Sequence, residues 1–402
     1  MNSTKADIYD VIVVGGGPAG SAAAFTASRG NLRVCLIDKT TFPRDKLCGG
    51  LVTQRSKNIF ERVFDREWDN KIINYSDEVV FFSDNKYLAS IDGYSRLYFT
   101  MRRDFDAYLL NLAQGAGVET KLGTNADIID LRKNSIHLKD GKEIGYRCLI
   151  GADGVSSQVA KELFGSSFDK DTIGFGLEVE VPKEKLAKQR DVVEIDFGVA
   201  KWGYGWVFPK KKTFTIGVGG IHKLNPDMKE HLAEYLLLKG LNIAEFRVKG
   251  QYIPFGDFRR YPGKDNVLLC GDAAGVVDPI TGEGIAYAMQ SGRAAAASAL
   301  RAIREDQPNR AFCYYAGDYR EITSSIRQAN FWRYLIFPKI IRKSFAWAFA
   351  DAGTLQRGYL DILAGKHEYN ALYKLFLVQI AKAFRKFFRF LLAKLRIGSN
   401  ST

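Results

Sequence analysis

The sequence predicts an α/β protein in which an antiparallel β-sheet domain is inserted into a parallel-sheet domain and a helical C-terminal region follows. Residues 172–258 look mainly β, with the apolar–polar alternation of half-buried strands at 192–197 and 214–218. Beyond about residue 311 the chain has helical periodicity. Short apolar runs that end in turns rich in Gly or Asp indicate buried parallel strands. These runs are residues 9–14, 32–37, 148–151 and 267–270.

This order of segments predicts discontinuous domains, which a chain of 402 residues is long enough to form. The parallel strands fall in three pieces, residues 1–77, 100–165 and 259–310. The inserted sheet domain is built from residues 78–99 and 166–258, with one helix near 228–239. Residues 311–402 form the helical C-terminal region.

The composition excludes several classes of protein. Hydrophobic residues make up 46% of the chain and charged residues 26%, so enough apolar surface exists for a folded core. The five cysteines are scattered and include no Cys-x-x-Cys pair, which argues against a zinc or dithiol site and fits a reducing compartment. The four histidines have no ligand spacing, so we expect no metal site.

The net charge is +13, and the positive excess is concentrated near the C-terminal end, where no acidic residue follows Glu368. Apolar residues between 377 and 395 recur at helical spacing, with basic residues opposite them, including Lys382, Arg385 and Arg389. The pattern predicts a basic amphipathic helix that lies on an anionic membrane surface. The alternative is a helix that docks on its own domain or on a second subunit. No nucleic-acid-binding motif accompanies the charge, so nucleic acid is not an expected partner.

The location expected from the sequence is the cytoplasm, with a peripheral position on the inner face of the membrane. The first apolar run ends at once in glycines, unlike a secretory signal. No uncharged apolar run is long enough to span a bilayer. The oligomeric state has no signal in the sequence.

The first apolar run leads into a dinucleotide fingerprint at residues 15–20. Gly15 allows the tight turn, Gly17 lets a pyrophosphate approach the backbone, and Gly20 lets the following helix pack closely on the strand. That helix presents its N-terminus to the phosphates. Asp38, at the end of the second strand, can accept hydrogen bonds from a ribose diol. The alternative is a glycine-rich turn with a structural role.

A second turn of this kind indicates that the dinucleotide is FAD. Asp272 follows the apolar run at 267–270, about 250 residues further along the chain, and can bind a ribityl hydroxyl. A domain that binds only NAD does not need this second strand and Asp, whereas the longer FAD does. The alternative is that Asp272 is a helix N-cap. On the first interpretation the parallel-sheet domain is a Rossmann-type FAD-binding domain and the inserted sheet is the substrate-binding domain.

The combination of motifs, in order, resembles the geranylgeranyl reductase family of FAD-dependent oxidoreductases, in the hydroxylase-like branch of the glutathione-reductase fold. The motifs are the fingerprint with Asp38, Cys48-Gly49-Gly50, Arg102-x-x-Phe105-Asp106, Ala152-Asp153-Gly154, Tyr204-Gly205-Trp206-Val207-Phe208-Pro209, and Asp272 with Pro279-x-Thr281-Gly282-Glu283-Gly284-Ile285. The resemblance covers most of residues 8–292.

The resemblance implies a set of FAD contacts, to which the fingerprint and the flavin motifs add Gly20, Asp153 and Gly282. Arg102 has the charge to neutralise a pyrophosphate, although a surface salt bridge is the alternative. A helix that begins near Ile285 could stabilise negative charge on the reduced ring. The implied contacts are Gly15, Gly17, Asp38, Cys48, Gly49, Leu51, Arg102, Ala126, Asp272, Gly284 and Ile285.

The candidate catalytic residues are Cys48, Tyr204 and Trp206. Tyr204 and Trp206 are two residues apart, so on a strand they share one face and, with Phe208, form an aromatic wall that Phe175 could extend. Such a wall suits a long apolar ligand and can stabilise positive charge in a reacting alkene. Cys48 could lie beside the flavin as a proton donor or set the polarity there. The alternatives are a packed β core for the aromatic residues and simple packing for Cys48.

The function expected from the resemblance is reduction of carbon–carbon double bonds in a polyprenyl lipid or quinone side chain. Reduced flavin supplies hydride, and NAD(P)H or ferredoxin is the expected external donor. One alternative is a monooxygenase that hydroxylates or epoxidises a hydrophobic compound. A second is a non-catalytic, flavin-bearing protein of the membrane surface.

Overall fold

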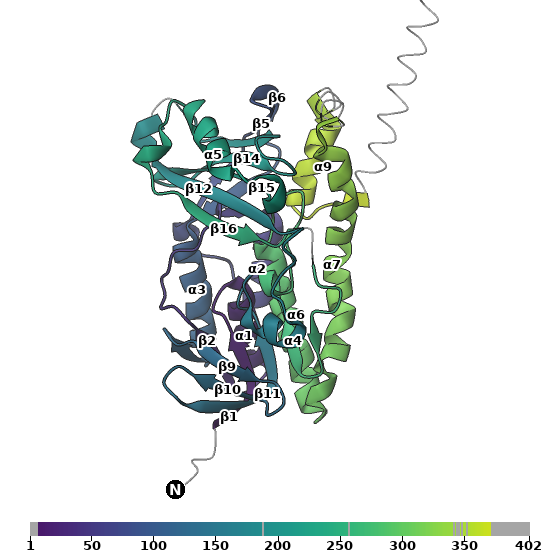
Figure 1. Ribbon diagram of the computed structural model, residues 1–402. Coiled ribbons are helices and arrows are strands. Elements are labelled where there is room, and N and C mark those ends of the chain that lie inside the picture. The colour runs from purple at the N-terminus through teal and green to yellow at the C-terminus, as the bar shows by residue number, and fades with distance from the viewer. Residues whose placement is uncertain are drawn as a thin grey trace, which may run out of the picture.

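The computed structural model describes residues 7–370 apart from 187–188, 256–257, 341, 343–345, 347–348 and 351–352. The predicted basic amphipathic helix at the C-terminal end therefore lies outside the described residues. Two large sheets lie one above the other, and the long helix α7 (Ala311–Ile336) runs beside both of them (Figure 1).

The lower sheet has eight strands and holds the predicted parallel strands side by side. β1 pairs in parallel with both β2 and β11, and β11 pairs in parallel with β18. β2 and β18 are buried throughout, and β1 and β11 are buried over their last four residues, as expected for a sheet that is covered on both faces. In spatial order they are β17 (Gly263–Lys264), β18 (Val267–Leu269), β11 (Glu143–Gly151), β1 (Asp7–Val14), β2 (Val34–Asp38) and β8 (Glu119–Leu122). In addition, β10 (Ser135–Leu138) pairs with β11, and β9 (Ala126–Asp130) pairs with β10.

Small residues allow the helices to pack closely on this sheet. α1 (Pro18–Arg29) and α6 (Ile285–Arg304) lie against each other. A Cβ atom on Gly292 of α6 would come within 2.1 Å of the Ala19 carbonyl oxygen, so only glycine permits this approach. The contact brings the fingerprint helix and the helix after the third flavin motif together, although more than 250 residues separate them.

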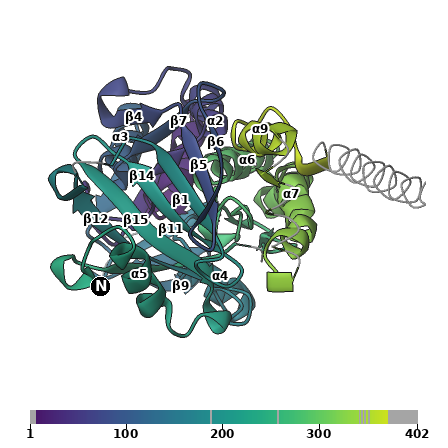
Figure 2. The same ribbon diagram turned by 90° about the horizontal axis from the view of Figure 1, so that it is seen from above.

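The upper sheet has seven strands and contains most of the predicted inserted domain. Helix α5 (Met228–Leu237) packs on one face, and residues of α7 and α9 (Gly353–Leu363) pack with the opposite end of the sheet (Figure 2). In spatial order the strands are β16 (Lys249–Ile253), β12 (Gly174–Pro182), β15 (Thr213–Ile221), β14 (Tyr204–Pro209), β13 (Val193–Phe197), β5 (Val79–Ser83) and β6 (Lys86–Ile91).

Two details of the predicted inserted domain are wrong. The sheet is not wholly antiparallel, because β13 pairs with β5 in parallel. The segment 78–99 is also divided, because its end belongs to β7 (Leu97–Thr100), which pairs with β3 (Leu51–Val52) and β4 (Ile73–Ser76) in a separate three-stranded sheet. Strand pairing between distant segments decides both points, and local alternation does not reveal it.

None of the described helices is both long enough and apolar enough to cross a membrane.

Candidate functional site

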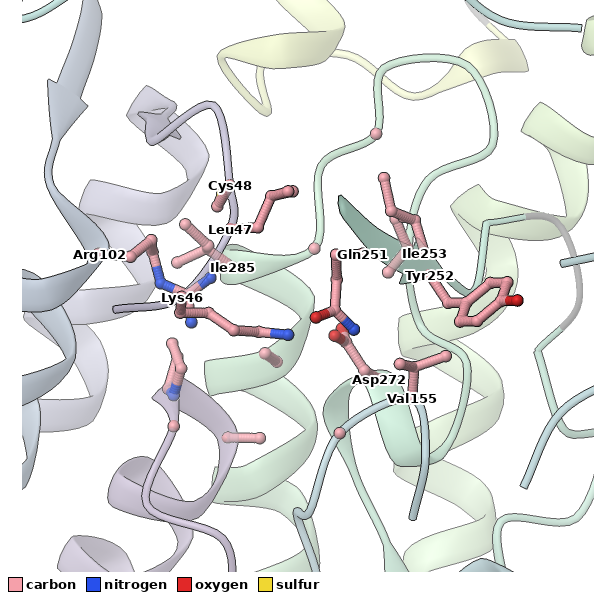
Figure 3. Close-up of a pocket in the computed structure, with 18 of the residues that line it drawn as sticks. Lys46, Leu47, Cys48, Arg102, Val155, Gln251, Tyr252, Ile253, Asp272 and Ile285 are labelled. Carbon is pink, nitrogen blue, oxygen red and sulfur yellow. The ribbon is translucent and has the colours of Figure 1, made fainter. Parts of the chain in front are cut away.

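A cavity of about 570 Å³ lies between the two large sheets. The fingerprint turn, the loop before β3, the start of α6 and the strands β14 and β16 all contribute to its wall. Every predicted site residue lines this cavity except Gly20. Figure 3 shows that side chains from these separate segments converge on one space, with Lys46 reaching across it toward Gln251 and Asp272.

The three fingerprint glycines have different physical roles. Gly15 has φ +105°, and a Cβ atom there would lie 2.3 Å from the Ala152 carbonyl oxygen. A Cβ atom on Gly20 would lie 1.7 Å from the Gly15 carbonyl oxygen, so Gly20 serves the packing of α1 on β1 and does not face the cavity. Gly17 is open on the cavity side, since its Cβ would meet nothing closer than Arg44 Nη2 at 3.7 Å. This open backbone at a helix N-terminus fits a phosphate group.

Asp38 is buried at the end of β2 and fixes the shape of the turn. Its Oδ2 accepts a hydrogen bond of 2.7 Å from the Gly16 N–H, and its Oδ1 accepts from the backbone and hydroxyl groups of Thr40 at 2.9 and 2.7 Å. A carboxylate oxygen has two lone pairs, so Oδ2 retains one acceptor site toward the cavity. A ribose hydroxyl fits this site.

Positive charge gathers on the side of the cavity next to the fingerprint. The buried Asp106 carboxylate pairs with Arg102 through Nε at 2.7 Å and Nη2 at 2.8 Å, and with Arg44 at 3.3 Å. The Arg102 contact is therefore a buried pair and not the surface salt bridge considered above. Lys46 also lines the cavity but has no ion pair among the described residues, and burial lowers its pKa. An excess of partly buried cations fits an anionic ligand such as a pyrophosphate.

Asp272 lies within a short 3₁₀ helix, Gly271–Ala273, whose N-cap is Cys270. The alternative that Asp272 is an N-cap is therefore wrong. Beside it lies the loop that leads into α6, where Gly282 has φ +71° and Gly284 is the N-cap; a Cβ atom on Gly284 would lie 3.8 Å from Asp272 Oδ1. Because Gly284 has no side chain and α6 begins at Ile285, backbone N–H groups are accessible from the cavity.

Asp153 lines the cavity, but its carboxylate is occupied by helix α4 (Gln158–Phe164). It accepts hydrogen bonds from the Ser157 hydroxyl at 2.5 Å and from the backbone N–H groups of Gln158 at 2.6 Å and Val159 at 3.2 Å. This side chain orders the turn after β11, so a contact from residue 153 to a cofactor would come from its backbone.

The loop that carries Cys48 is tied to the upper sheet by a buried carboxyl. Glu178 of β12 accepts a hydrogen bond of 3.0 Å from the Cys48 N–H through Oε1, and Oε2 has no hydrogen-bond partner among the described residues. Burial raises the pKa of Glu178 to about 7. A Cβ atom on Gly49 would lie 2.7 Å from the Phe208 ring, so the loop lies directly against the aromatic residues of β14.

Tyr204 and Trp206 both line the cavity, as the shared strand face predicts. Their rings are 5.9 Å apart, and Trp206 and Phe208 are stacked at 6.2 Å. The Tyr204 hydroxyl donates a hydrogen bond of 2.6 Å to the Thr281 carbonyl oxygen. Phe175 does not line the cavity and instead packs against Tyr252, so its predicted place in the wall is wrong.

Several lining residues were not predicted from the sequence. Lys46 is the one that the sequence could have indicated, because it lies two residues before the Cys-Gly-Gly element. Trp202 and the strand β16 carry no motif, and Phe337 lies beyond the region that the motifs cover. The other missed apolar and polar wall residues include Gln251, Tyr252, Ile253 and Phe255.

Within the described part of the chain, no group of three or more His, Cys, Asp or Glu side chains could hold a metal ion. Cys35, Cys148 and Cys270 are buried free thiols in or beside the parallel strands, where they pack as small apolar residues.

The site fits FAD: an open glycine backbone at a helix N-terminus, a carboxylate with a free acceptor site and a half-buried lysine without an ion pair among the described residues face one cavity. Residues 10–98 match the family described as FAD dependent oxidoreductase. The protein is thus a flavin-dependent oxidoreductase.

Relatives identify the branch of this class. The geranylgeranyl diphosphate reductase of Rhodobacter capsulatus is 32% identical over 314 residues, which cover 75% of this chain and 77% of the relative. The digeranylgeranylglycerophospholipid reductase of Methanocaldococcus jannaschii is 30% identical over 317 residues, covering 74% and 78%. The menaquinone reductase of Mycobacterium tuberculosis is 30% identical over 313 residues, covering 72% and 76%. The chain belongs to the geranylgeranyl reductase family.

Solved structures agree on the fold. A geranylgeranyl bacteriochlorophyll reductase-like protein from Thermoplasma acidophilum has a TM-score of 0.69 and 22% identity, with 90% of this chain and 91% of that chain covered. A probable FAD-dependent monooxygenase from Pseudomonas aeruginosa has a TM-score of 0.67 and 18% identity, with 86% and 100% covered. Reductases and a probable monooxygenase therefore share this architecture, and the fold alone does not separate the two reactions.

Proposed function

We propose that the protein reduces carbon–carbon double bonds in the polyprenyl chain of a lipid or quinone, with electrons that NAD(P)H or ferredoxin delivers to FAD. The observation that carries the proposal is the direct contact between the aromatic wall of β14 and the two loops on the flavin side. Gly49 lies against Phe208, and Tyr204 is hydrogen-bonded to Thr281. A long apolar chain that lies along this wall would meet the cofactor side of the cavity.

The residues that would hold FAD come from four separate segments. The open backbone at Gly17 and the N-terminus of α1 would bind the pyrophosphate, with Arg102 and Lys46 supplying positive charge. Asp38 would accept from a ribose hydroxyl and Asp272 from the ribityl chain. The loop at Gly282 and Gly284 would approach the ring. When bound, FAD supplies hydride and takes up electrons from the donor.

The protein's own contribution is a dry and oriented pocket for the chain. Trp206 is 7% exposed and Phe208 is 6% exposed, so the wall excludes water from the reacting bond. An isolated alkene is a poor hydride acceptor, so positive charge must develop on it as a proton arrives. The faces of the aromatic rings favour such charge. Alignment of the chain along the wall replaces a random encounter with a held geometry.

Two side chains are candidates for the proton donor. The Tyr204 proton is engaged with the Thr281 carbonyl oxygen, and burial raises the pKa of its phenol, so the hydroxyl is better suited to positioning the loop than to losing a proton. The Cys48 thiol lines the cavity, and its own loop is held by Glu178. We therefore propose that Cys48 is the proton donor.

We further propose that the protein works at the inner face of the membrane, in the cytoplasm. A polyprenyl substrate dissolves in lipid, and the basic amphipathic pattern of residues 377–395 supports contact with an anionic surface.

Anaerobic turnover tests the proposed reaction against its alternatives. The purified, FAD-loaded protein, whose flavin has been reduced chemically, is mixed with a geranylgeranyl lipid in the absence of oxygen. The mass of the lipid product is then measured by mass spectrometry. Reduction adds two hydrogen atoms per double bond without oxygen. A product that appears only with oxygen and gains an oxygen atom would identify a monooxygenase. Reduced flavin that no geranylgeranyl lipid reoxidises would instead support the non-catalytic alternative.

A further inference from the structure

The end of α7 forms one rim of the cavity. Phe337 follows α7 and lines the cavity, and its backbone N–H donates a hydrogen bond of 3.0 Å to the Arg333 carbonyl oxygen. Residues four apart on a helix lie on the same face. Arg333 is therefore one helical turn away from a residue of the cavity wall.

Besides Phe337, Trp202 also links Arg333 to the cavity. This indole lines the cavity, the Arg333 guanidinium carbon lies 5.7 Å from its ring centroid, and the Tyr334 ring lies 4.9 Å from it in an edge-on contact. Trp202 has φ +56°, which is an unfavourable conformation for a bulky residue. The adjacent backbone is held by Asn225, whose side chain bonds both the N–H of Lys201 at 2.7 Å and its carbonyl oxygen at 2.8 Å. The fold thus sustains strain to keep Trp202 at this rim.

Arg333 lacks the partners that its neighbours have. Its Nε and Nη1 atoms are buried and have no hydrogen-bond partner among the described residues. By contrast, Arg327 on the same helix bonds the Arg320 carbonyl oxygen at 2.7 Å, and Arg342 pairs with Asp84 at 2.7 Å. Arg333 as a whole is only half-buried, so its guanidinium has two buried nitrogens without an acceptor on a side chain that is partly open to solvent. Buried nitrogens without an acceptor are unfavourable, and the planar fork of a guanidinium matches a phosphate.

Exposed apolar side chains and one exposed lysine lie close to Arg333 along the chain. Phe331, Tyr334 and Ile340 are 64%, 54% and 91% exposed, and Lys339 is also exposed. Exposed apolar groups next to cations are typical of a surface that meets the boundary between lipid and water. A molecule with an anionic head and an apolar chain matches both the surface and the cavity behind it.

We propose that Arg333 is the binding site for the phosphate head group of the substrate, whose apolar chain enters the cavity past Trp202 and lies along Tyr204 and Trp206. This inference rests on the proposed function and adds to it the chemistry of the substrate's head. The phosphate has two sources, a free prenyl diphosphate or a phospholipid within the membrane.

The test compares two ligands with the same chain, geranylgeranyl diphosphate and the neutral geranylgeraniol, in binding titrations with the FAD-loaded protein. The variants are Arg333→Met, Arg333→Lys and the control Arg327→Met. We expect Arg333→Met to bind the diphosphate about tenfold or more weakly, because a charge-assisted hydrogen bond is lost, while its affinity for the alcohol is unchanged. Arg333→Lys should recover part of the loss, and Arg327→Met should match the parent protein.

A vesicle arm identifies the source of the phosphate. If the head belongs to a membrane lipid, Arg333→Met should lose binding to phosphatidylglycerol vesicles that contain a prenyl-chain phospholipid, relative to vesicles without it. If the natural substrate is a free prenyl diphosphate, Arg333→Met should bind soluble geranylgeranyl diphosphate more weakly, and its binding to both kinds of vesicle should match that of the parent protein. Equal affinities of Arg333→Met and the parent protein for every phosphate ligand would overturn the head-group site and leave the proposed function standing. If the parent protein binds neither geranylgeranyl compound, both are overturned.

Discussion

The Tyr204 hydroxyl and the Thr281 carbonyl oxygen are 2.6 Å apart and join the aromatic strand of the upper sheet to the loop that starts α6. Both residues line the cavity, so this bond fixes the distance between the substrate wall and the flavin-side loop. A Cβ atom on the neighbouring Gly282 would lie 2.7 Å from the same hydroxyl, so the loop closes tightly around it.

Replacing Tyr204 with Phe should preserve the aromatic wall of the cavity but remove the hydrogen bond that holds the loop at Thr281. The ring stays in place, while the Thr281 carbonyl oxygen loses its donor, which should cost about 1–3 kcal/mol of stability. We expect bound FAD to be retained and the rate of lipid reduction to fall several-fold. Urea unfolding and single-turnover oxidation of the reduced flavin measure the two effects. A variant as stable and as fast as the parent protein would show that the bond has no such role.

The fingerprint glycines should separate folding from cofactor binding. Gly17→Ala adds a methyl group whose nearest protein atom would be Arg44 Nη2 at 3.7 Å, an ordinary contact without a clash, so the fold should keep its stability while FAD affinity falls about tenfold. Gly20→Ala forces a carbon to within 1.7 Å of the Gly15 carbonyl oxygen and should destabilise the fold by about 3 kcal/mol or more.

Thermal unfolding without cofactor and FAD fluorescence titration distinguish these two variants. If Gly17→Ala loses stability as Gly20→Ala does, the open side of Gly17 is not a ligand surface.

Removing the charge of Lys46 should weaken FAD binding. Burial lowers the pKa of this ammonium group more than the charge of Asp272 raises it, and Lys46 has no ion pair among the described residues, so a bound pyrophosphate would supply counter-charge that the protein does not. We expect Lys46→Met to lose about tenfold in FAD affinity, with a weaker dependence of the remaining affinity on salt.

Fluorescence titrations at low and high salt give both quantities. The exposed Lys264 of β17 provides the matched control, since Lys264→Met removes one charge far from the cavity wall. Unchanged affinity in Lys46→Met would exclude this lysine from the cofactor site.

Glu178 should make stability depend on pH. Burial raises its pKa to about 7 from 4.5, so the unfolded chain loses the proton first as the pH rises. The free energy of unfolding should therefore fall between about pH 4.5 and pH 7, by up to about 3 kcal/mol for this group. Glu178→Gln removes the titration but can keep an acceptor for the Cys48 N–H.

The variant should accordingly be more stable than the parent protein at pH 8, with a smaller difference at pH 4.5. Urea unfolding at both pH values tests this, with the exposed Glu230→Gln on α5 as control. The expectation fails if the two proteins show the same slope with pH.

Tyr369 should hold the flavin-side loop from the C-terminal region. Its hydroxyl lies 2.9 and 2.8 Å from the two carboxylate oxygens of Asp278, whose Oδ1 also accepts from the Ile280 and Thr281 N–H groups at 2.9 Å. Tyr369→Phe should lower stability by about 1.5–3 kcal/mol, because a hydrogen bond to a buried charged acceptor is lost.

The exposed Tyr261→Phe should change stability by less than about 0.5 kcal/mol. Chemical unfolding compares the two variants directly, and equal effects would contradict the role of Tyr369.

The sequence by itself determined the parts that depend on local chemistry. The glycine spacing at 15–20 and the carboxylate at Asp38 define a phosphate-binding turn wherever a strand and helix flank them. Tyr204 and Trp206 are two residues apart and therefore share one face of a strand, because side chains alternate between the two faces. Motif order was also enough to predict that turns at 15–20 and 271–275 meet, because parallel strands end at one edge of a sheet.

Only the tertiary structure decided which residues close the site. The division of residues 78–99 between two sheets depends on strand partners. Phe175 lies outside the cavity wall because the register aligns Gly176, not Phe175, with Gly219 and Tyr204, so Phe175 packs on the α5 side of the sheet. Lys46 and Trp202 line one cavity from distant segments, Arg333 packs on Trp202 from a third, and no local pattern encodes this arrangement. Their environment depends on burial and on missing partners, which are properties of the folded chain and not of any short stretch of it.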